Sequence, residues 1–223
     1  MKFLLELKNI NVYIGNVQIL RNISISMRPG EVIALVGPNG AGKTTTLKSI
    51  LGILPIRAGR IFFEDQDITH LSVVERVKKG IGYSPEDRRL IPDLTVEENI
   101  LLPLWVSNFS ERDIRGLLER IYEIIPEIKK FKDRKAGHLS GGQQKMVSIA
   151  RALIRMPKLL LLDEPFEGLA PIMAKRFVDL FEQIKKMGIS IIIAESNITY
   201  PREISDKIVR IERGEIIEVV ENA

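Results

Sequence analysis

Several residue types that support particular structures are absent or scarce in this chain of 223 residues. It has no cysteine, which excludes disulfide bonds and thiolate metal sites. No apolar run approaches the roughly 20 residues that a membrane-spanning helix needs. Because Glu6 and Lys8 interrupt the apolar start of the chain, we expect no signal peptide. These absences together predict an intracellular protein with no direct membrane insertion.

The charge balance is also mild. The chain has 33 basic and 29 acidic residues and a net charge of +4, which by itself is too small to indicate nucleic-acid binding. Hydrophobic residues make up 45% of the sequence, enough to form a packed core. The length suits one α/β domain, or a core that contains one inserted subdomain.

Strand-like and helix-like patterns alternate along much of the chain. Alternating apolar and polar residues predict antiparallel strands at 3–14 and 23–27, and short apolar runs predict buried strands at 32–36, 59–63, 81–83, 159–162 and 189–194. Helices are predicted for residues 43–51, from Ser110 onward, from Ser140 to before Pro157, and from Pro171 to Gly188. A hairpin around Arg213 is predicted near the end. The order predicts an α/β nucleotide-binding core with an antiparallel β subdomain and an inserted α-helical subdomain.

We expect residues 1–85 and 157–223 to form the core with its β subdomain, and residues 86–156 to form the helical subdomain. Between Thr45 and Leu139 there is no sustained heptad pattern of the kind that a coiled coil requires.

The first chemical motif follows the predicted strand at 32–36. It fits the pattern G-x-x-x-x-G-K-[ST] of a phosphate-binding loop, between a strand and a helix as the motif requires. Its backbone N–H groups and the helix N-terminus would face phosphate, Lys43 would neutralise phosphate charge, and the Thr44 hydroxyl would bind Mg²⁺. The predicted nucleotide-binding residues here are Gly37, Pro38, Asn39, Gly40, Ala41, Gly42, Lys43, Thr44 and Thr45.

Later in the chain, two acidic residues directly follow a run of four leucines. Asp163 and Glu164 end the predicted strand at 159–162, where buried carboxylates are costly unless a cation meets them. We expect Asp163 to hold Mg²⁺, directly or through water.

Ahead of the acids, a third motif begins a predicted helix. Its residues would present a hydroxyl and backbone donors at a second helix N-terminus, and so predict a second anion site. They are Ser140, Gly141, Gly142 and Gln143, preceded by Leu139.

In this order, the three motifs resemble those of the ATP-binding cassette (ABC) ATPases, and the resemblance covers almost the whole chain. It implies a RecA-like phosphate-loop core with ATP and Mg²⁺ as cofactors, and Glu164 as the residue that polarises the attacking water. It implies that the second anion site serves the ATP of the opposite subunit in a head-to-tail homodimer or heterodimer. It also implies that Tyr13 stacks on adenine, for which the alternative is a half-exposed strand aromatic.

Three stretches, at 83–89, 94–99 and 168–171, are similar to the ATPase subunits of branched-chain amino-acid importers. Glu86 stands where the wider superfamily has glutamine, and its carboxylate could reach Mg²⁺ or a bound water, which gives Thr44, Asp163 and Glu86 as the predicted metal set. The resemblance implies transmembrane permease subunits that dock near residues 86–105. It places the chain in the cytoplasm, peripheral at the inner face of the membrane.

Ser196 departs from the family, which usually has histidine at this position, or glutamine in this branch. The predicted catalytic set is therefore Glu164, Glu86 and Ser196. The leading interpretation is the ATP-hydrolysing subunit of a branched-chain amino-acid importer. The alternative is an ATP-binding switch module that hydrolyses weakly because of Ser196. A third class, DNA-associated ABC ATPases, is set aside because it requires a long coiled coil.

Overall fold

The structure is a computed structural model that describes residues 2–107 and 109–222. Its strands are β1 (Leu5–Ile14), β2 (Val17–Met27), β3 (Val32–Val36), β4 (Ala58–Phe63), β5 (Gln66–Asp67), β6 (Ile81–Ser84), β7 (Leu159–Asp163), β8 (Ser190–Glu195), β9 (Lys207–Glu212) and β10 (Glu215–Glu221). Its helices are α1 (Lys43–Leu51), α2 (Val73–Lys78), α3 (Val96–Trp105), α4 (Glu111–Ile124), α5 (Pro126–Lys129), α6 (Gly141–Leu153), α7 (Pro171–Lys186) and α8 (Pro201–Ile204), with a 3-10 turn at Ala136–His138.

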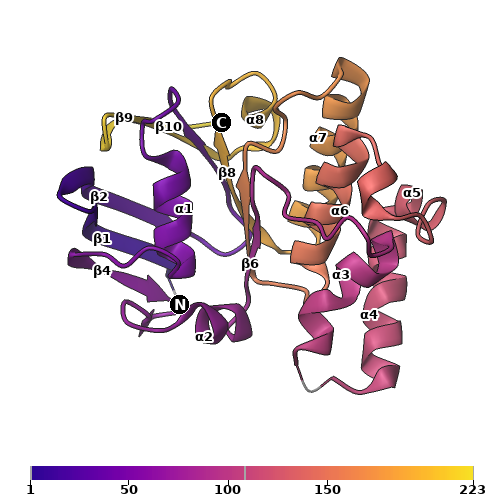
Figure 1. The fold of residues 1–223 in the computed structure, drawn as a ribbon. Helices are drawn as coiled ribbons and strands as arrows, with labels where there is room; N and C mark the ends of the chain where they lie inside the picture. The colour runs from indigo at the N-terminus through magenta and orange to yellow at the C-terminus, as the bar shows by residue number, and fades with distance from the viewer. Residues whose placement is uncertain (1, 108, 223) are drawn as a thin grey trace.

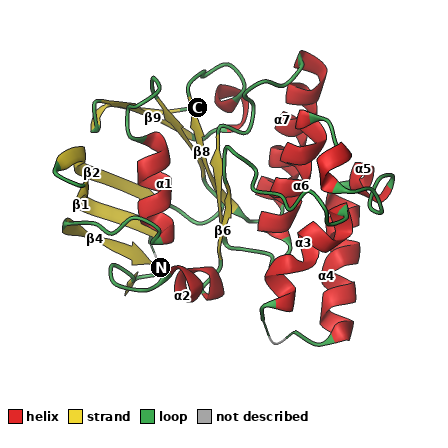
Figure 2. Cartoon of the chain, viewed as in Figure 1, coloured by secondary structure: helices red, strands yellow, loops and turns green. Residues whose placement is uncertain are grey.

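Two sheets organise the fold. A small antiparallel sheet has the order β2-β1-β4-β5, and a larger sheet has the order β10-β9-β3-β8-β7-β6. In the larger sheet the neighbours from β9 to β6 run parallel, and β10 pairs antiparallel with β9 at the edge. Helix α1 lies between the sheets, and α3, α4, α6 and α7 gather on the other side of the larger sheet (Figures 1 and 2).

The leucine run of β7 shows why the central strands are apolar throughout. Leu160 and Leu162 pack into the core on the helical side, whereas Leu159 and Leu161 pack into the core shared with α1 and the small sheet. Successive side chains of a strand point to opposite faces, so a strand covered on both sides needs an unbroken apolar sequence. The same strand then delivers Asp163 and Glu164 to the carboxyl edge of the sheet, where the site forms.

The predicted fold class is confirmed, and β3 and α1 have the predicted bounds. The predicted start of β2 is wrong, because the strand begins at Val17 and not at residue 23. Helices α2 and α3 were not assigned individually, although Ser72 with Glu75 and Thr95 with Glu98 form capping boxes at their starts. Helices α3 to α6 fall within residues 86–156, and the division into subdomains at these positions stays a prediction.

No helix within the described residues combines the length and the apolar character needed to cross a membrane.

Candidate nucleotide site

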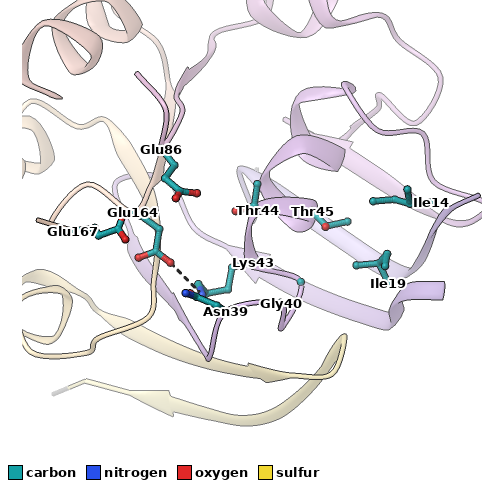
Figure 3. A pocket seen from close by; sticks show the side chains of 11 residues that line it. Ile14, Ile19, Asn39, Gly40, Lys43, Thr44, Thr45, Glu86, Glu164 and Glu167 are labelled. Atoms are coloured by element: carbon teal, nitrogen blue, oxygen red, sulfur yellow. Dashed lines mark ion pairs between the residues drawn. The ribbon is translucent and has the colours of Figure 1, made fainter. Parts of the chain in front are cut away.

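The phosphate-binding loop joins β3 to α1 and lines a cavity of about 350 Å³. Two of its glycines are required by the geometry. A Cβ on Gly37 would lie 2.1 Å from the carbonyl oxygen of Ile211, and Gly42 has a φ of 110°, in the left-handed region. The loop residues that line the cavity are Asn39, Gly40, Gly42, Lys43, Thr44 and Thr45, joined by Ile14, Ile19, Glu86, Glu164 and Glu167 (Figure 3).

The ammonium group of Lys43 is buried beneath this loop. Its Nζ donates to the carbonyl oxygens of Gly37 and Pro38, at 2.7 and 3.2 Å, and lies 3.2 Å from Oε1 of Glu164. Its side chain is only 5% exposed, so these partners replace the water that the charge has lost. The ion pair is drawn as the dashed line in Figure 3. Lys43 is therefore positioned to neutralise phosphate charge in the cavity.

Glu164 directly follows β7 and has a left-handed conformation, with a φ of 47°. Its carboxylate accepts hydrogen bonds from the Ser196 hydroxyl, at 2.7 Å, and from the Ser196 N–H, at 3.1 Å. Burial alone would raise the pKa of Glu164, but hydrogen bonds from Glu195 and Ser196, with the Lys43 charge, outweigh burial and lower this pKa. A carboxylate held ionised beside a phosphate loop can accept a proton from, or orient, an attacking water.

The Ser196 hydroxyl lies within hydrogen-bonding distance of three side chains. Besides Glu164, its hydroxyl oxygen lies 3.1 Å from Nζ of Lys43 and 2.8 Å from Oδ1 of Asn39. In this arrangement Ser196 orients Glu164, and it does not line the cavity.

Asp163 and Thr44 come together beside this cavity: Thr44 lines it, and both residues line a second cavity of about 400 Å³. Thr44 donates its hydroxyl to Oδ1 of Asp163 at 2.9 Å, and Tyr83 donates its phenol to Oδ2 at 3.0 Å. Burial raises the pKa of Asp163, against the effect of these two hydrogen bonds. Burial also raises the pKa of Glu86, with further increases from Glu167, Asp163 and Glu164.

This concentration of carboxylates fits a hard cation such as Mg²⁺, which prefers oxygen ligands. The side-chain oxygens of Thr44 and Asp163 are already in contact, and Glu86 lines both cavities together with Thr44 (Figure 3). Among the residues that the structure describes, no three His, Cys, Asp or Glu side chains converge to hold an ion unaided. Phosphate and water oxygens would therefore have to complete the coordination, as is usual for magnesium bound with a nucleotide.

The third motif forms a separate, open site. Ser140 caps α6, its hydroxyl accepting the Gln143 N–H at 3.3 Å while the Ser140 N–H donates to Oε1 of Gln143 at 3.0 Å. Ser140 and Gly141 are exposed, and none of the residues 140–143 lines the phosphate-loop cavity. The structure thus leaves this helix N-terminus exposed and apart from the same chain's phosphate loop.

Tyr13 requires a correction, because the structure does not bring it to the cavity. Its ring lies against the Arg57 guanidinium, 4.8 Å from the ring centroid, while Ile14 and Ile19 line the cavity. Neighbouring residues of a strand point to opposite faces, so Tyr13 and Ile14 cannot both face the nucleotide loop. The surface available to a base is aliphatic.

Sequence reasoning missed two buried residues behind Glu164. Glu195 accepts the N–H of Phe166 at 2.7 Å, and Lys145 donates from α6 to the backbone carbonyl of Glu164. Burial, followed by the neighbouring Glu164, raises the pKa of Glu195 to about 9. Burial lowers the pKa of Lys145. The signal for Glu195 was a carboxylate directly after the apolar run at 190–194, the same signal that identified Asp163.

The fold and the site define a phosphate-loop nucleotide-binding protein in which a second capped helix N-terminus, that of α6, lies apart from the loop. The family model for ABC transporters matches residues 20–167. The chain belongs to this family, and it is an ATP-binding, ATP-hydrolysing subunit of an ABC transporter.

The chain aligns with relatives of known sequence over most of its length. The chain is 33% identical to the high-affinity branched-chain amino acid transport ATP-binding protein BraG of Pseudomonas aeruginosa, over 96% of this chain and 91% of that protein. It is equally 33% identical to the lipopolysaccharide export system ATP-binding protein LptB of Escherichia coli, over 90% of this chain and 83% of that protein. Relatives of similar identity therefore serve different transport systems.

Solved structures share the fold over nearly the whole chain. The ADP conformation of MJ1267, an ATP-binding cassette of an ABC transporter, superimposes with a TM-score of 0.86 and 32% identity, covering 99% of this chain and 92% of that one. A dimeric post-hydrolysis state of the cassette MJ0796, bound to ADP and phosphate, gives a TM-score of 0.88 and 26% identity, covering 98% and 99%.

Proposed function

We propose that the chain hydrolyses Mg-ATP as a head-to-tail dimer, in which each phosphate-loop cavity is completed by residues 140–143 of the other subunit. The observation that carries this proposal is the separation of the two anion sites. The phosphate loop opens into a lined cavity, whereas Ser140 and Gly141 are exposed and lie outside it. The dimeric form of the related MJ0796 cassette supports the same arrangement.

Within one cavity, the proposed roles follow from the contacts. Lys43 binds phosphate oxygens, and Glu164 orients the attacking water and accepts its proton. Ser196 holds Glu164 through two hydrogen bonds. Lys43 would exchange its ion pair with Glu164 for the phosphates when ATP binds, which frees the Glu164 carboxylate for water.

Thr44 and Asp163 would hold Mg²⁺, with Glu86 near enough to accept a hydrogen bond from one of its waters. When bound, the ion supplies positive charge that offsets the charge on the phosphate oxygens. Tyr83 keeps one oxygen of Asp163 occupied, leaving the other for Thr44 and the ion.

For the transported solute, we propose uptake of branched-chain amino acids. The similarity to BraG and to the branched-chain transport protein LivF of Archaeoglobus fulgidus, which is 33% identical over 91% of this chain, supports it. The sequence features that support it are Glu86 and the stretches at 94–99 and 168–171. Homodimer and heterodimer fit the proposal equally.

A second candidate function is an ATP-binding switch with weak hydrolysis. Ser196, in place of the usual histidine, favours it, because the Ser196 hydroxyl is engaged by Glu164 and does not line the cavity. Hydrolysis is favoured instead by the presence at the site of Lys43, Asp163 and Glu164. Turnover of purified protein with Mg-ATP separates the two functions, since the switch predicts stable binding with almost no phosphate release.

A groove between the core and the helical segment is the proposed docking site for the permease. Two adjoining cavities of about 400 and 240 Å³ share Tyr83 and Arg151 in their walls. Exposed apolar side chains lie nearby at Ile53, Ile91 and Trp105. Leu101, in the same stretch, is 8% exposed and belongs to the core, so it is not part of this surface. This docking would hold the chain at the inner face of the membrane.

Cross-linking tests the docking proposal directly, because the chain has no native cysteine. Cysteine at the exposed positions Arg89 or Asp93 should form cross-links to the permease in membranes that hold the assembled transporter. Cysteine at Arg213, whose side chain is 91% exposed on the distant hairpin, is the matched control. Cross-links from Arg213 alone would count against the groove. Stimulation of turnover in this assembly by leucine, isoleucine or valine then tests the solute.

A further inference from the structure

Arg88 stands outside the roles described so far, yet its guanidinium lies beside the start of α6. It follows Glu86 by two positions, and its Nη1 donates to Oε1 of Gln144 at 3.0 Å. A Cβ built on Gly141 would lie 3.9 Å from both Nη1 and Nη2 of Arg88. The guanidinium therefore lies against the first residue of α6, beside Ser140.

The positive charge of Arg88 is not balanced by an ion pair in the part of the chain that the structure describes. Within the described residues, no acidic side chain forms an ion pair with Arg88, and its buried Nε has no hydrogen-bond partner. The N-terminus of a helix carries partial positive charge, so a cation placed there is unfavourable until an anion joins it. Arg88 and the first N–H groups of α6 thus form one cationic surface.

The loop that carries Arg88 is held in this position by α6 itself. Arg88 and Arg89 have φ values of 60° and 48°, in a region that residues other than glycine seldom adopt. Arg151 donates to the carbonyl oxygens of both, at 2.6 and 2.8 Å, and the Ser148 hydroxyl donates to that of Arg88 at 3.3 Å. Contacts with Gln144, Ser148 and Arg151, along one face of α6, therefore fix the Arg88 side chain beside Gly141.

We propose that Arg88 binds the terminal phosphate of the ATP held by the opposite subunit, beside the donors of Ser140, Gly141 and Gly142. The planar guanidinium suits bidentate contact with phosphate oxygens. The inference rests on the head-to-tail dimer proposed above. It also ties the second anion site to the docking groove, since Glu86, Arg89 and Arg151 line one of its cavities.

The test uses the full chain with Glu164→Gln, which should accumulate the ATP-bound dimer. Arg88→Gln, Arg88→Lys and the control Arg89→Gln are each added to this parent. The dimer dissociation constant is measured by analytical ultracentrifugation in Mg-ATP, and ATP affinity of the monomer is measured by calorimetry at low protein concentration.

We expect Arg88→Gln to weaken the dimer at least about tenfold, because a charged hydrogen-bond partner is lost at each nucleotide. Arg88→Lys should weaken it less, and Arg89→Gln should match the parent. ATP affinity of the monomer should stay unchanged in all three. Arg88→Gln with the parent's dimer constant would overturn the inference.

Gln144→Ala separates a phosphate role from a structural one, because it removes the intrachain partner of Arg88 while keeping the charge. If Arg88 is a phosphate ligand, this change should weaken the dimer clearly less than Arg88→Gln does, because the charge remains and only one of the contacts that hold Arg88 is lost. A loss equal to that of Arg88→Gln would instead show that Arg88 only supports α6, and the inference would fail.

Ser140→Arg in the same parent distinguishes failure of the inference from failure of the proposed dimer. If Ser140→Arg abolishes the dimer and Arg88→Gln does not weaken it, Arg88 alone has been misassigned. If Ser140→Arg leaves the dimer intact, the head-to-tail arrangement is itself wrong.

Discussion

The two anion sites of this chain differ in how far a single subunit completes them. Around the phosphate loop, Lys43 is buried and bonded to two carbonyls and a carboxylate, and Asp163 is bonded to Thr44 and Tyr83. Around Ser140, the motif is exposed and the nearby Arg88 has no acidic partner in the described part of the chain. In the proposed dimer, this difference means that one site binds nucleotide alone, whereas the other requires a second subunit to bring the phosphate.

The largest expected effect comes from Glu164→Gln. Removing the carboxylate that orients water should slow turnover by about 100- to 10,000-fold, the usual range for a general base. ATP binding should survive, so the comparison predicts a chemical defect without a binding defect. Steady-state phosphate release and equilibrium ATP binding, measured on the same preparation, provide the check. Near-normal turnover would remove Glu164 from its role.

The next largest effect is expected for Lys43→Ala, which alters the phosphate-loop site and leaves the site at Ser140 intact. The loss of one charged hydrogen-bond partner should weaken ATP binding to the monomer by about 10- to 100-fold. Ser140→Arg should spare monomer binding and reduce turnover, because it obstructs only the site that faces the other subunit. Calorimetry measures the ATP affinity of both variants as monomers. An equal loss of affinity in both would contradict the different roles given to the two sites.

Ser196→Ala should have a smaller effect on turnover. Its hydroxyl gives Glu164 one hydrogen bond, while the Ser196 N–H keeps the other. Loss of the hydroxyl should cost about 0.5–1.5 kcal/mol, or about two- to tenfold in turnover, with ATP affinity little changed. Turnover equal to that of the native chain would make Ser196 a bystander, and the positioning role would be lost.

A separate prediction concerns the stability of the fold, and not turnover, through Glu195. Because burial raises the pKa of Glu195 to about 9, the folded state holds a proton that the unfolded state releases near pH 4.5. This carboxyl therefore stabilises the fold less as pH rises between these values. Glu195→Gln should remove this loss, so its free energy of unfolding relative to the native chain should be higher at pH 8 than at pH 6. Urea denaturation at both values checks the sign, and no change with pH would mean that Glu195 is ionised in the folded state.

Most of the phosphate-loop site was predictable from sequence because its motifs are local. Residues 37–42 form the loop between β3 and α1 and residues 43–45 begin α1, while Asp163 and Glu164 stand at the end of a buried apolar strand. Tyr13 was mispredicted by one position, since the pattern located the strand end but not which face of it meets the cavity. Lys145 and Glu195 were missed because their importance arises from contacts between α6, β7 and β8, which residue spacing does not reveal.

Arg88 shows the same limit at the second site. In the sequence it stands two positions after Glu86, whereas its close approach to Gly141 joins residues more than fifty positions apart. Two left-handed residues and three anchoring side chains on α6 create that contact, and such backbone geometry has no simple sequence signal when glycine is absent.

Complementation between two defective variants tests most directly whether the two sites of one chain act on different nucleotides. Lys43→Ala and Ser140→Arg are each placed in the Glu164→Gln chain, and ATP retained after gel filtration is counted for each variant and for their mixture. The account predicts little retention by either alone, and about one ATP per mixed dimer, because one intact phosphate loop then faces one intact signature motif. A mixture that retains no more ATP than the separate variants, while the parent retains it fully, would contradict the account.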